Sequence, residues 1–278
     1  TDLSNPSCAG SGTVTVTIDN SVTITATPDT TLCNGTTPSI QLNSTSTGSS
    51  LPGSLSCGVN GTSCTQPSQT TSIGSGTLSS STYCPFFSGP TYSDVRYQFL
   101  YTADELIAAG VQSGTITEMA FNVLVKNSTV PYENFTLGIG CTSDGCMATS
   151  TGWLTTQTVY GPTNFSTSLG WNTMVFSQGF DWDGVSNIVI NTCFDFPDSA
   201  SAGGWDNTEY TSALACAMTM RSYSFSAGES GCSMPTPTNN YSAKPNAQFT
   251  WCPAPPNPFQ YSWSPTTDLS DPNISNPV

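Results

Sequence analysis

Residues 13–27 alternate between apolar and polar side chains with a period of two. The apolar positions of this run are Val14, Val16, Ile18, Val22, Ile24 and Ala26. Because successive side chains of a strand point to opposite faces, this period predicts β-structure, and Asp19-Asn20 divides it into two strands. A further short strand is predicted at 39–42. The Ser-, Thr- and Gly-rich stretch 44–56 that follows predicts a surface linker.

From about residue 57 onward, aromatic residues become frequent, and clusters of Gly, Asn and Asp separate strand-like runs. These runs are at 95–101, 115–125, 134–139, 172–176, 187–192, 213–220 and 246–251. One short helix is predicted, with Thr102 as its cap, Glu105 completing a capping box and Gly110 ending it. Many short strands with a single helix predict an all-β fold, here a β-sandwich of jelly-roll type.

The chain has few charges, and they are strongly unbalanced. Only 8% of its residues are charged, but eighteen acidic residues oppose four basic ones, and the net charge is −14. Nucleic acids and anionic membrane surfaces bind clusters of Lys and Arg, so we expect neither as a partner. No apolar run is long enough to insert this segment into a membrane. The aromatic and β-branched content argues against disorder, and the composition is typical of an extracellular β-protein.

Eleven cysteines and the absence of histidine favour disulfides in an oxidising compartment over metal sites. The spacings of Cys57 with Cys64 and of Cys141 with Cys146 suit short disulfide-closed loops, although spacing does not fix connectivity. The remaining candidates, for longer bridges, are Cys84, Cys193, Cys216, Cys232 and Cys252. Because the count is odd, at least one cysteine is expected to be free or paired elsewhere, with Cys8 and Cys33 as the favoured candidates.

A six-residue sequence occurs near both ends of the chain in nearly the same form. Thr1-Asp-Leu-Ser-Asn-Pro6 matches Thr267-Asp-Leu-Ser-Asp-Pro272. A close match at so long an offset predicts that the chain is a segment of a longer array of similar units.

The flanking sequences resemble a known module. Residues 261–278 are similar to the middle of a PKD-like, immunoglobulin-type module that recurs in giant surface adhesins of bacteria with type IX secretion. Residues 26–35 resemble the start of such a module, and 12–17 resemble its final strands. The resemblance implies that 57–252 is a domain inserted into a loop of a PKD-like β-sandwich.

That resemblance implies a complete domain plan. Residues 1–20 would end a preceding module, while 21–46 and 259–278 would form a split, incomplete one. Residues 47–56 and 253–258 would be linkers.

The inserted stretch resembles a second family found in the same class of secreted proteins. The segments that carry the resemblance are 96–100, 103–110, 116–123, 170–173 and 182–189. The resemblance implies a non-catalytic jelly-roll module without a defined ligand.

Two oxygen-rich clusters are candidate calcium sites. Asp181 and Asp183 precede Gly184, and Asp268 and Asp271 stand near two asparagines. Calcium prefers carboxylate and carbonyl oxygens. The alternative is that Asp-Gly, Asp-Pro and Asn-Pro pairs simply form turns. No other cofactor is expected.

Exposed aromatic side chains on a β-sandwich can stack on sugar rings. The best candidate is Trp205, where Asp206 and Asn207 would bind hydroxyl groups and Tyr210 would add a second ring. The alternative is that Trp205 packs within its loop. Trp171 and Trp182 lie beside predicted strands and are expected in the core.

We expect no catalysis. Without histidine the usual general base is missing. Carboxylate pairs such as Asp104 with Glu105, or Asp181 with Asp183, would be needed to cleave a glycoside. Acidic residues in a first helical turn, however, complement the helix dipole without any chemistry.

The sequence therefore predicts a structural and adhesive repeat of a large secreted cell-surface protein that forms a filament or appendage. Its expected partners are neighbouring repeats or copies of the same protein. The alternative is a carbohydrate-binding module on a PKD-like stalk, with surface glycans of other cells as ligands. A solvent-facing Trp/Tyr cluster would favour the second function, and apolar patches that match a partner subunit would favour the first.

Overall fold

The computed structural model describes residues 23–26, 44–47, 55–87, 94–195, 205–224 and 230–255. The chain divides into two compact units, one formed by Thr1–Leu51 with Pro256–Val278 and the other by Pro52–Pro255.

In the first unit, β1 (Thr23–Ala26) pairs antiparallel with β2 (Ser44–Thr47). The first strand confirms the prediction from the alternating pattern, but the second corrects the predicted linker at 44–56. The alternating Ser and Thr of β2 supply a full set of backbone donors and acceptors to β1, and Thr favours extended backbone. The other residues assigned to PKD-like modules lie outside the described ranges.

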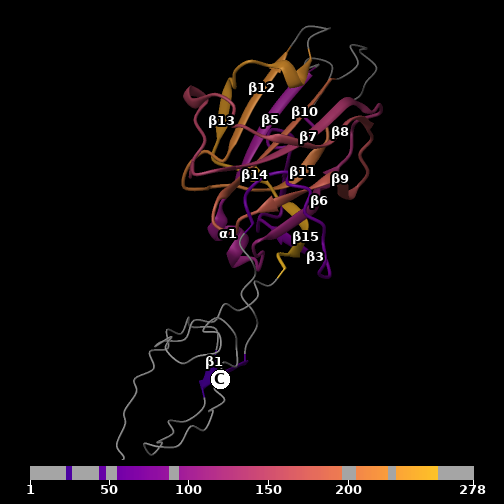
Figure 1. Ribbon diagram of the computed structural model, residues 1–278. Helices are drawn as coiled ribbons and strands as arrows, with labels where there is room; N and C mark the ends of the chain where they lie inside the picture. Colours follow the sequence, from indigo (N-terminus) through magenta and orange to yellow (C-terminus); the bar gives the residue numbers. More distant parts are fainter. Residues whose placement is uncertain are drawn as a thin grey trace, which may run out of the picture. The chain divides into compact units, whose positions relative to one another are not determined.

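The second unit is built from two antiparallel sheets (Figure 1). The first sheet has the order β13 (Asn239–Tyr241), β12 (Thr219–Ser224), β5 (Asp94–Tyr101), β10 (Asn187–Asp195), β7 (Tyr132–Thr142) and β8 (Gln157–Phe165). The second has the order β14 (Lys244–Pro245), β11 (Asn207–Thr211), β6 (Gly114–Val125), β15 (Ala247–Pro253) and β3 (Gln69–Ile73). In the same sheet, β9 (Gly170–Trp182) pairs with β6, and β4 (Leu78–Ser80) pairs with β11. The all-β prediction is confirmed.

One hydrophobic core lies between the two sheets. On β5 the inward positions are aromatic or aliphatic, and on β15 they include Phe249 and Trp251, both almost completely buried. Residues of β6, β7, β9 and β10 complete the same cluster. The period of two seen in the sequence therefore reports the face of each strand that the opposite sheet covers.

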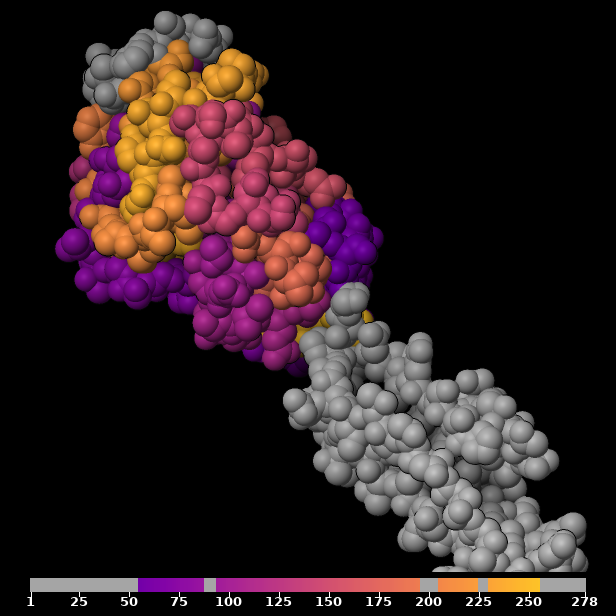
Figure 2. All heavy atoms as spheres, turned by 90° about the vertical axis from the view of Figure 1, so that its left-hand side faces the viewer, coloured from indigo at the N-terminus to yellow at the C-terminus, as the bar shows by residue number. Residues whose placement is uncertain are grey.

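The other face of the six-stranded sheet is also covered. Leu100, Val189 and Met220 point away from the core and are buried against Met147 and Met218. Figure 2 shows the rose-coloured segment between β7 and β8, which includes the short helix η1 (Thr149–Thr151), beside the yellow segment that includes η2 (Gly231–Ser233). This part of the sheet face is therefore covered by the connecting segments that carry Met147 and Met218.

The single predicted α-helix is confirmed as α1 (Ala103–Ala108). The Thr102 hydroxyl oxygen accepts a hydrogen bond from the Glu105 amide at 3.3 Å, as an N-cap should. Gly110 follows with φ of +96°, a conformation that favours glycine and ends the helix.

One predicted strand needs correction, and several strands were not predicted. Of 213–220, only the last two residues belong to β12; before them, Ala213 adopts φ of +58° and Cys216 is held by a disulfide, so the chain cannot run straight. The strands that were not predicted include β3, β8 and β11, and of these β8 contains Gly161-Pro162, a pair that indicates a break in a strand. Proline is tolerated there because β8 lies at the edge of its sheet.

Candidate functional site

The cysteines predicted to close short loops form disulfides with distant partners instead. The four bonds are Cys57–Cys141, Cys64–Cys252, Cys146–Cys216 and Cys193–Cys232, with sequence separations of 84, 188, 70 and 39 residues. The local pairs Cys57–Cys64 and Cys141–Cys146 were therefore wrong. Cys84 is buried and free, while Cys8 and Cys33 lie outside the described residues.

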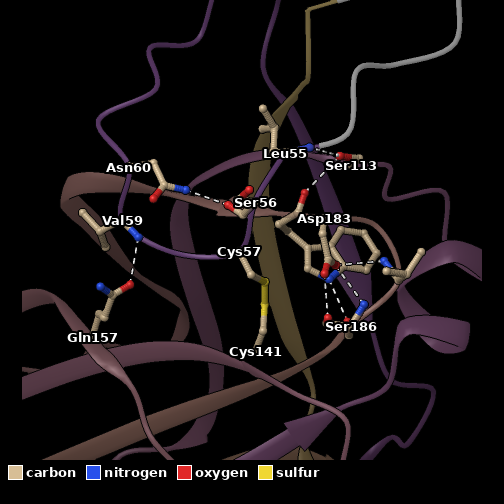
Figure 3. Close-up of a disulfide and its surroundings, with 12 residues drawn as sticks. Leu55, Ser56, Cys57, Val59, Asn60, Ser113, Cys141, Gln157, Asp183 and Ser186 are labelled. Carbon is tan, nitrogen blue, oxygen red and sulfur yellow. Dashed lines mark hydrogen bonds between the residues drawn. A yellow bond between two sulfur atoms is a disulfide. The ribbon is translucent and has the colours of Figure 1, made fainter.

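The reason for the long-range pairing lies in the path of residues 57–64. Gly58 exchanges two backbone hydrogen bonds with Asp181 of β9, at 3.0 and 2.8 Å, so this stretch runs along the sheet and does not turn back on itself. Cys57 then meets the end of β7 (Figure 3), and Cys64 meets the end of β15. Spacing along the sequence could not reveal this, because both partners are supplied by the tertiary fold.

The two chain ends of the second unit lie side by side. The Leu55 amide donates to Ser113 Oγ at 3.4 Å, and the Ala254 amide donates to the Ser113 carbonyl oxygen at 2.9 Å. Ala254 is buried, with 3% of its surface exposed. These residues, which fall in the predicted linkers 47–56 and 253–258, are fixed parts of the fold. The Cys64–Cys252 bond joins the same two ends covalently.

Both aspartates of the first predicted calcium site bind protein donors. Asp181 is almost completely buried and accepts hydrogen bonds from the Thr62 and Thr115 hydroxyls. Asp183 accepts from the Val185 and Ser186 amides at 2.9 and 2.8 Å, and from the Ser186 hydroxyl (Figure 3). Partial burial opposes ionisation of Asp183, but these hydrogen bonds outweigh it and lower the pKa. This geometry is that of the turn alternative.

Within the described ranges, one group of three cysteine or acidic side chains lies close enough to hold a metal ion: Cys57, Cys141 and Asp183. Because the two sulfur atoms are bonded to each other, neither is a thiolate ligand. The second predicted calcium cluster, Asp268 and Asp271, lies outside the described residues.

The four residues of the predicted sugar site do not form one surface. Asp206 is fully buried and accepts five hydrogen bonds from four residues; the donors are the Asn127 and Ser128 amides and the Ser128, Tyr132 and Thr167 hydroxyls. It fixes the turn after β6 and has no lone pair turned to solvent.

The three other residues of that predicted site lie apart. The Trp205 ring is 36% exposed, but one face stacks on Phe87 at 5.4 Å between centroids. Tyr210 packs on Tyr83 at 4.9 Å, and Asn207 pairs with Val125 in the sheet. Sugar binding at Trp205 stays a prediction, and Trp205 is the most exposed of the four residues.

Trp171 and Trp182 behave differently from each other. Trp182 is fully buried, as expected, and its indole N–H donates to the Ser186 carbonyl oxygen at 2.8 Å. Trp171 was expected in the core but is 36% exposed. Its neighbour Asn172 and then Met174 take the inward positions of β9, so Trp171 lies on the outer face of the seven-stranded sheet. Sequence periodicity on β9 carried this signal.

All four basic residues of the chain have protein partners. Lys244 is 3% exposed and forms an ion pair with Glu105, and Arg221 is 8% exposed and donates to the hydroxyls of Tyr97 and Tyr241. Arg96 lies 4.5 Å from the Trp153 ring, and Lys126 donates to Ser128 and Thr167.

Comparison with known proteins gives no relative. No family model matches the sequence, and no curated protein and no solved structure shows detectable similarity to it. Searching the described residues for helices long and apolar enough to cross a membrane finds none.

Proposed function

We propose that this chain is a structural and adhesive module of a large secreted cell-surface protein, built to transmit force with little lengthening. The observation that carries the proposal is the Cys64–Cys252 bond, which closes a loop of 188 residues and joins the two ends of the second unit. The module would transmit tension between the neighbouring modules of the array.

The force path through the second unit is short. Nine residues separate Leu55, where tension enters, from Cys64. Three residues separate Cys252 from Pro255, where tension leaves. Nearly all of the strands lie inside the closed loop. The loop cannot be pulled out while the bond is intact, because the covalent path bypasses it. Extension is then limited to about 12 residues, roughly 40 Å at ~3.5 Å per residue.

Further features support a position in an extracellular array. Four disulfides are typical of oxidising compartments. The repeated hexapeptide and the resemblance of the flanking sequences to PKD-like modules of type IX-secreted adhesins support a filament or appendage. Neighbouring repeats or copies of the same protein would be its structural partners, and the second unit would be a jelly-roll-like insert in that array.

The proposal assigns no catalytic step. Of the carboxylate pairs considered for glycoside cleavage, Glu105 forms an ion pair with Lys244, Asp181 binds two threonine hydroxyls, and Asp183 closes its own turn. The chain also contains no histidine. Each described carboxylate of these pairs except Asp104 thus has a structural partner.

Single-molecule stretching of the full chain between its termini tests the proposal. The increase in contour length on unfolding is compared for the oxidised chain, the reduced chain and two double variants. With all disulfides reduced, the 188 residues between Cys64 and Cys252 should add on the order of 650 Å. The oxidised chain should lack this step.

The variants separate the force-bearing bond from the others. In Cys64→Ser with Cys252→Ser, two other bonds still shorten the path. Tension then crosses only 5 residues from Cys141 to Cys146 and 36 from Cys216 to Cys252, or about 140 Å. In the matched control, Cys146→Ser with Cys216→Ser, no added length is expected. An oxidised wild-type chain that shows this step of about 650 Å would overturn the proposal.

A further inference from the structure

The strand register defines the outer face of the seven-stranded sheet residue by residue, and the outward residues of its flanking strands β9 and β3 are exposed. Strands β9, β6, β15 and β3 lie side by side in that order across much of it (Figure 1). On these strands the residues that point inward, such as Met119, Phe121 and Phe249, are buried in the core. The residues between them therefore face outward. These outward residues form three rows across the strands.

The first row begins with the exposed Trp171 of β9. It lies directly opposite Asn122 of β6, whose side-chain amide donates to a carboxylate oxygen of Glu209 on β11 at 3.2 Å. Glu209 is in turn opposite Ser79 of β4. This row therefore crosses four strands and carries in turn an indole ring, an amide, a carboxylate and a hydroxyl. Its length is roughly 14 Å, since neighbouring strands are ~4.8 Å apart.

The second row consists of Thr173, Ala120, Gln248 and Ser72 in pairwise register. The Gln248 side-chain amide donates to Ser72 Oγ at 3.2 Å. Ala120 lies between Thr173 and Gln248 in the register and is only 3% exposed, so the exposed contacts of this row come from its three polar residues.

The third row consists of Val175, Glu118, Thr250 and Thr70. The Thr70 and Thr250 hydroxyls lie 3.0 Å apart and share a hydrogen bond. Together the three rows present hydroxyls, two side-chain amides and two carboxylates around one exposed indole, with no Lys or Arg among them.

We propose that this face, centred on Trp171, binds a neutral polysaccharide chain. This inference rests on the adhesive function proposed above and adds to it the chemical class of the ligand. A neutral sugar ring has an apolar C–H face that the Trp171 indole can cover, and a rim of hydroxyls that are both donors and acceptors. Amides and hydroxyls match either role, and carboxylates accept strongly from hydroxyls.

The charges of the face select against other occupants. Glu118 and Glu209 would repel uronic acids, sulfated sugars and nucleic acids. A second copy of a chain with a net charge of −14 would place like charges against each other. Val175 of the third row is 59% exposed, and Leu124, the next outward residue of β6 after Asn122, is 40% exposed. A protein partner is therefore the rival occupant, and the measurement of self-association tests it.

The test is binding of the full oxidised chain to a panel of neutral polysaccharides: cellulose, chitin, xylan, mannan, starch and a β-1,3-glucan. Polygalacturonate serves as the acidic control. Depletion of protein from solution is measured for wild type, Trp171→Ala, Glu209→Gln and Trp205→Ala. Wild type should bind at least one neutral polymer and not polygalacturonate. Trp171→Ala should weaken binding by about tenfold or more, because aromatic anchors dominate such contacts.

Trp205→Ala tests the other predicted sugar site, since both tryptophans are exposed to the same extent but only Trp171 lies in the rows. Binding lost in Trp205→Ala and kept in Trp171→Ala would place the sugar at Trp205 and overturn the inference, and thermal melting should show that each variant is folded. A panel without binding, or binding unchanged in Trp171→Ala, overturns the inference. Self-association that Trp171→Ala abolishes would also overturn it, by showing a second copy on this face. None of these results bears on the stretching experiment, which tests the adhesive module separately.

Discussion

Cys64 and Cys252 are bonded to each other with their Cα atoms 5.8 Å apart, although 188 residues separate them in the sequence. The bond lies beside the place where the chain enters and leaves the second unit, and Ser113 holds both chain segments there through hydrogen bonds. Covalent and non-covalent links therefore coincide at one end of the sandwich. This arrangement makes the second unit a closed loop.

Removing this bond should destabilise the second unit about as much as removing the bond between Cys193 and Cys232. With the Cys57–Cys141 and Cys146–Cys216 bonds intact, the unfolded chain already connects Cys64 to Cys252 through 7, 5 and 36 residues, 48 in all. Chain entropy then gives about 4 kcal/mol for closing this loop and about 4 kcal/mol for the loop of 39 residues. Denaturant titration of the two serine double variants measures both losses. Equal stability of the Cys64→Ser/Cys252→Ser variant and wild type would contradict the account.

Asp206 should be a stability determinant and not a ligand-binding residue. Asp206→Asn replaces an acceptor by a donor that faces hydroxyls and amides, so we expect a loss of about 3 kcal/mol or more in the free energy of unfolding. Tyr132→Phe, which removes one donor to the same carboxylate, should cost about 1 kcal/mol. Similar melting temperatures for Asp206→Asn and wild type would show that the carboxylate is not needed.

The ion pair between Glu105 and Lys244 should matter because Lys244 is buried. Glu105→Gln leaves the ammonium without its counter-charge, with the Leu100 carbonyl oxygen and the Tyr101 ring as its other contacts. We expect a loss of about 3 kcal/mol. Asp104→Asn, one residue away in the same helical turn and exposed, is the control and should change stability by less than about 0.5 kcal/mol. Equal effects of the two substitutions would refute the pairing.

Cys84 should make the fold sensitive to alkali. Burial raises the pKa of its thiol from 9.0 to about 12, against a weaker opposing hydrogen bond from the Phe86 amide. The unfolded chain loses this proton near pH 9 and the folded chain does so only near pH 12, so stability falls as the pH rises between these values. The difference corresponds to about 4 kcal/mol at most.

A Cys84→Ala variant checks this contribution. Its stability should fall less steeply between pH 9 and 12 than that of the wild type, while the buried phenols of Tyr97 and Tyr101 add a loss of the same sign in both proteins. In the folded wild type at neutral pH, a thiol reagent should leave Cys84 unmodified until denaturant is added. Rapid modification of the native chain would contradict its burial.

The sequence predicted those parts of the fold that local patterns determine. Alternation located β5, β6 and β15, and the capping residues Thr102 and Glu105 located α1. It failed where a partner distant in sequence decides the outcome. Strand β8 forms despite Gly161-Pro162 because β7 offers an edge, and the cysteines pair across the fold and not within their loops.

The candidate sites were harder to predict than the strands for the same reason. Asp206 looked like a ligand for hydroxyls, and it is one, but the hydroxyls belong to Ser128, Tyr132 and Thr167 of the same chain. The outward row at Trp171 joins residues of four strands and becomes visible only through their register. The alternation along β9 could have predicted that Trp171 faces outward, because it is out of phase with the apolar Met174 and Phe176. It could not predict which residues of the other strands lie beside Trp171.

The proposed function depends on a covalent link between the two ends of the second unit, and disulfide mapping detects that link. The full chain is treated with a thiol blocker at acidic pH, digested without reductant, and its linked peptides are identified by mass spectrometry. We expect Cys64 to be linked to Cys252 and Cys57 to Cys141. Local links between Cys57 and Cys64 and between Cys141 and Cys146 would contradict the proposed function, because the loop would then be open and tension would unravel the sheets.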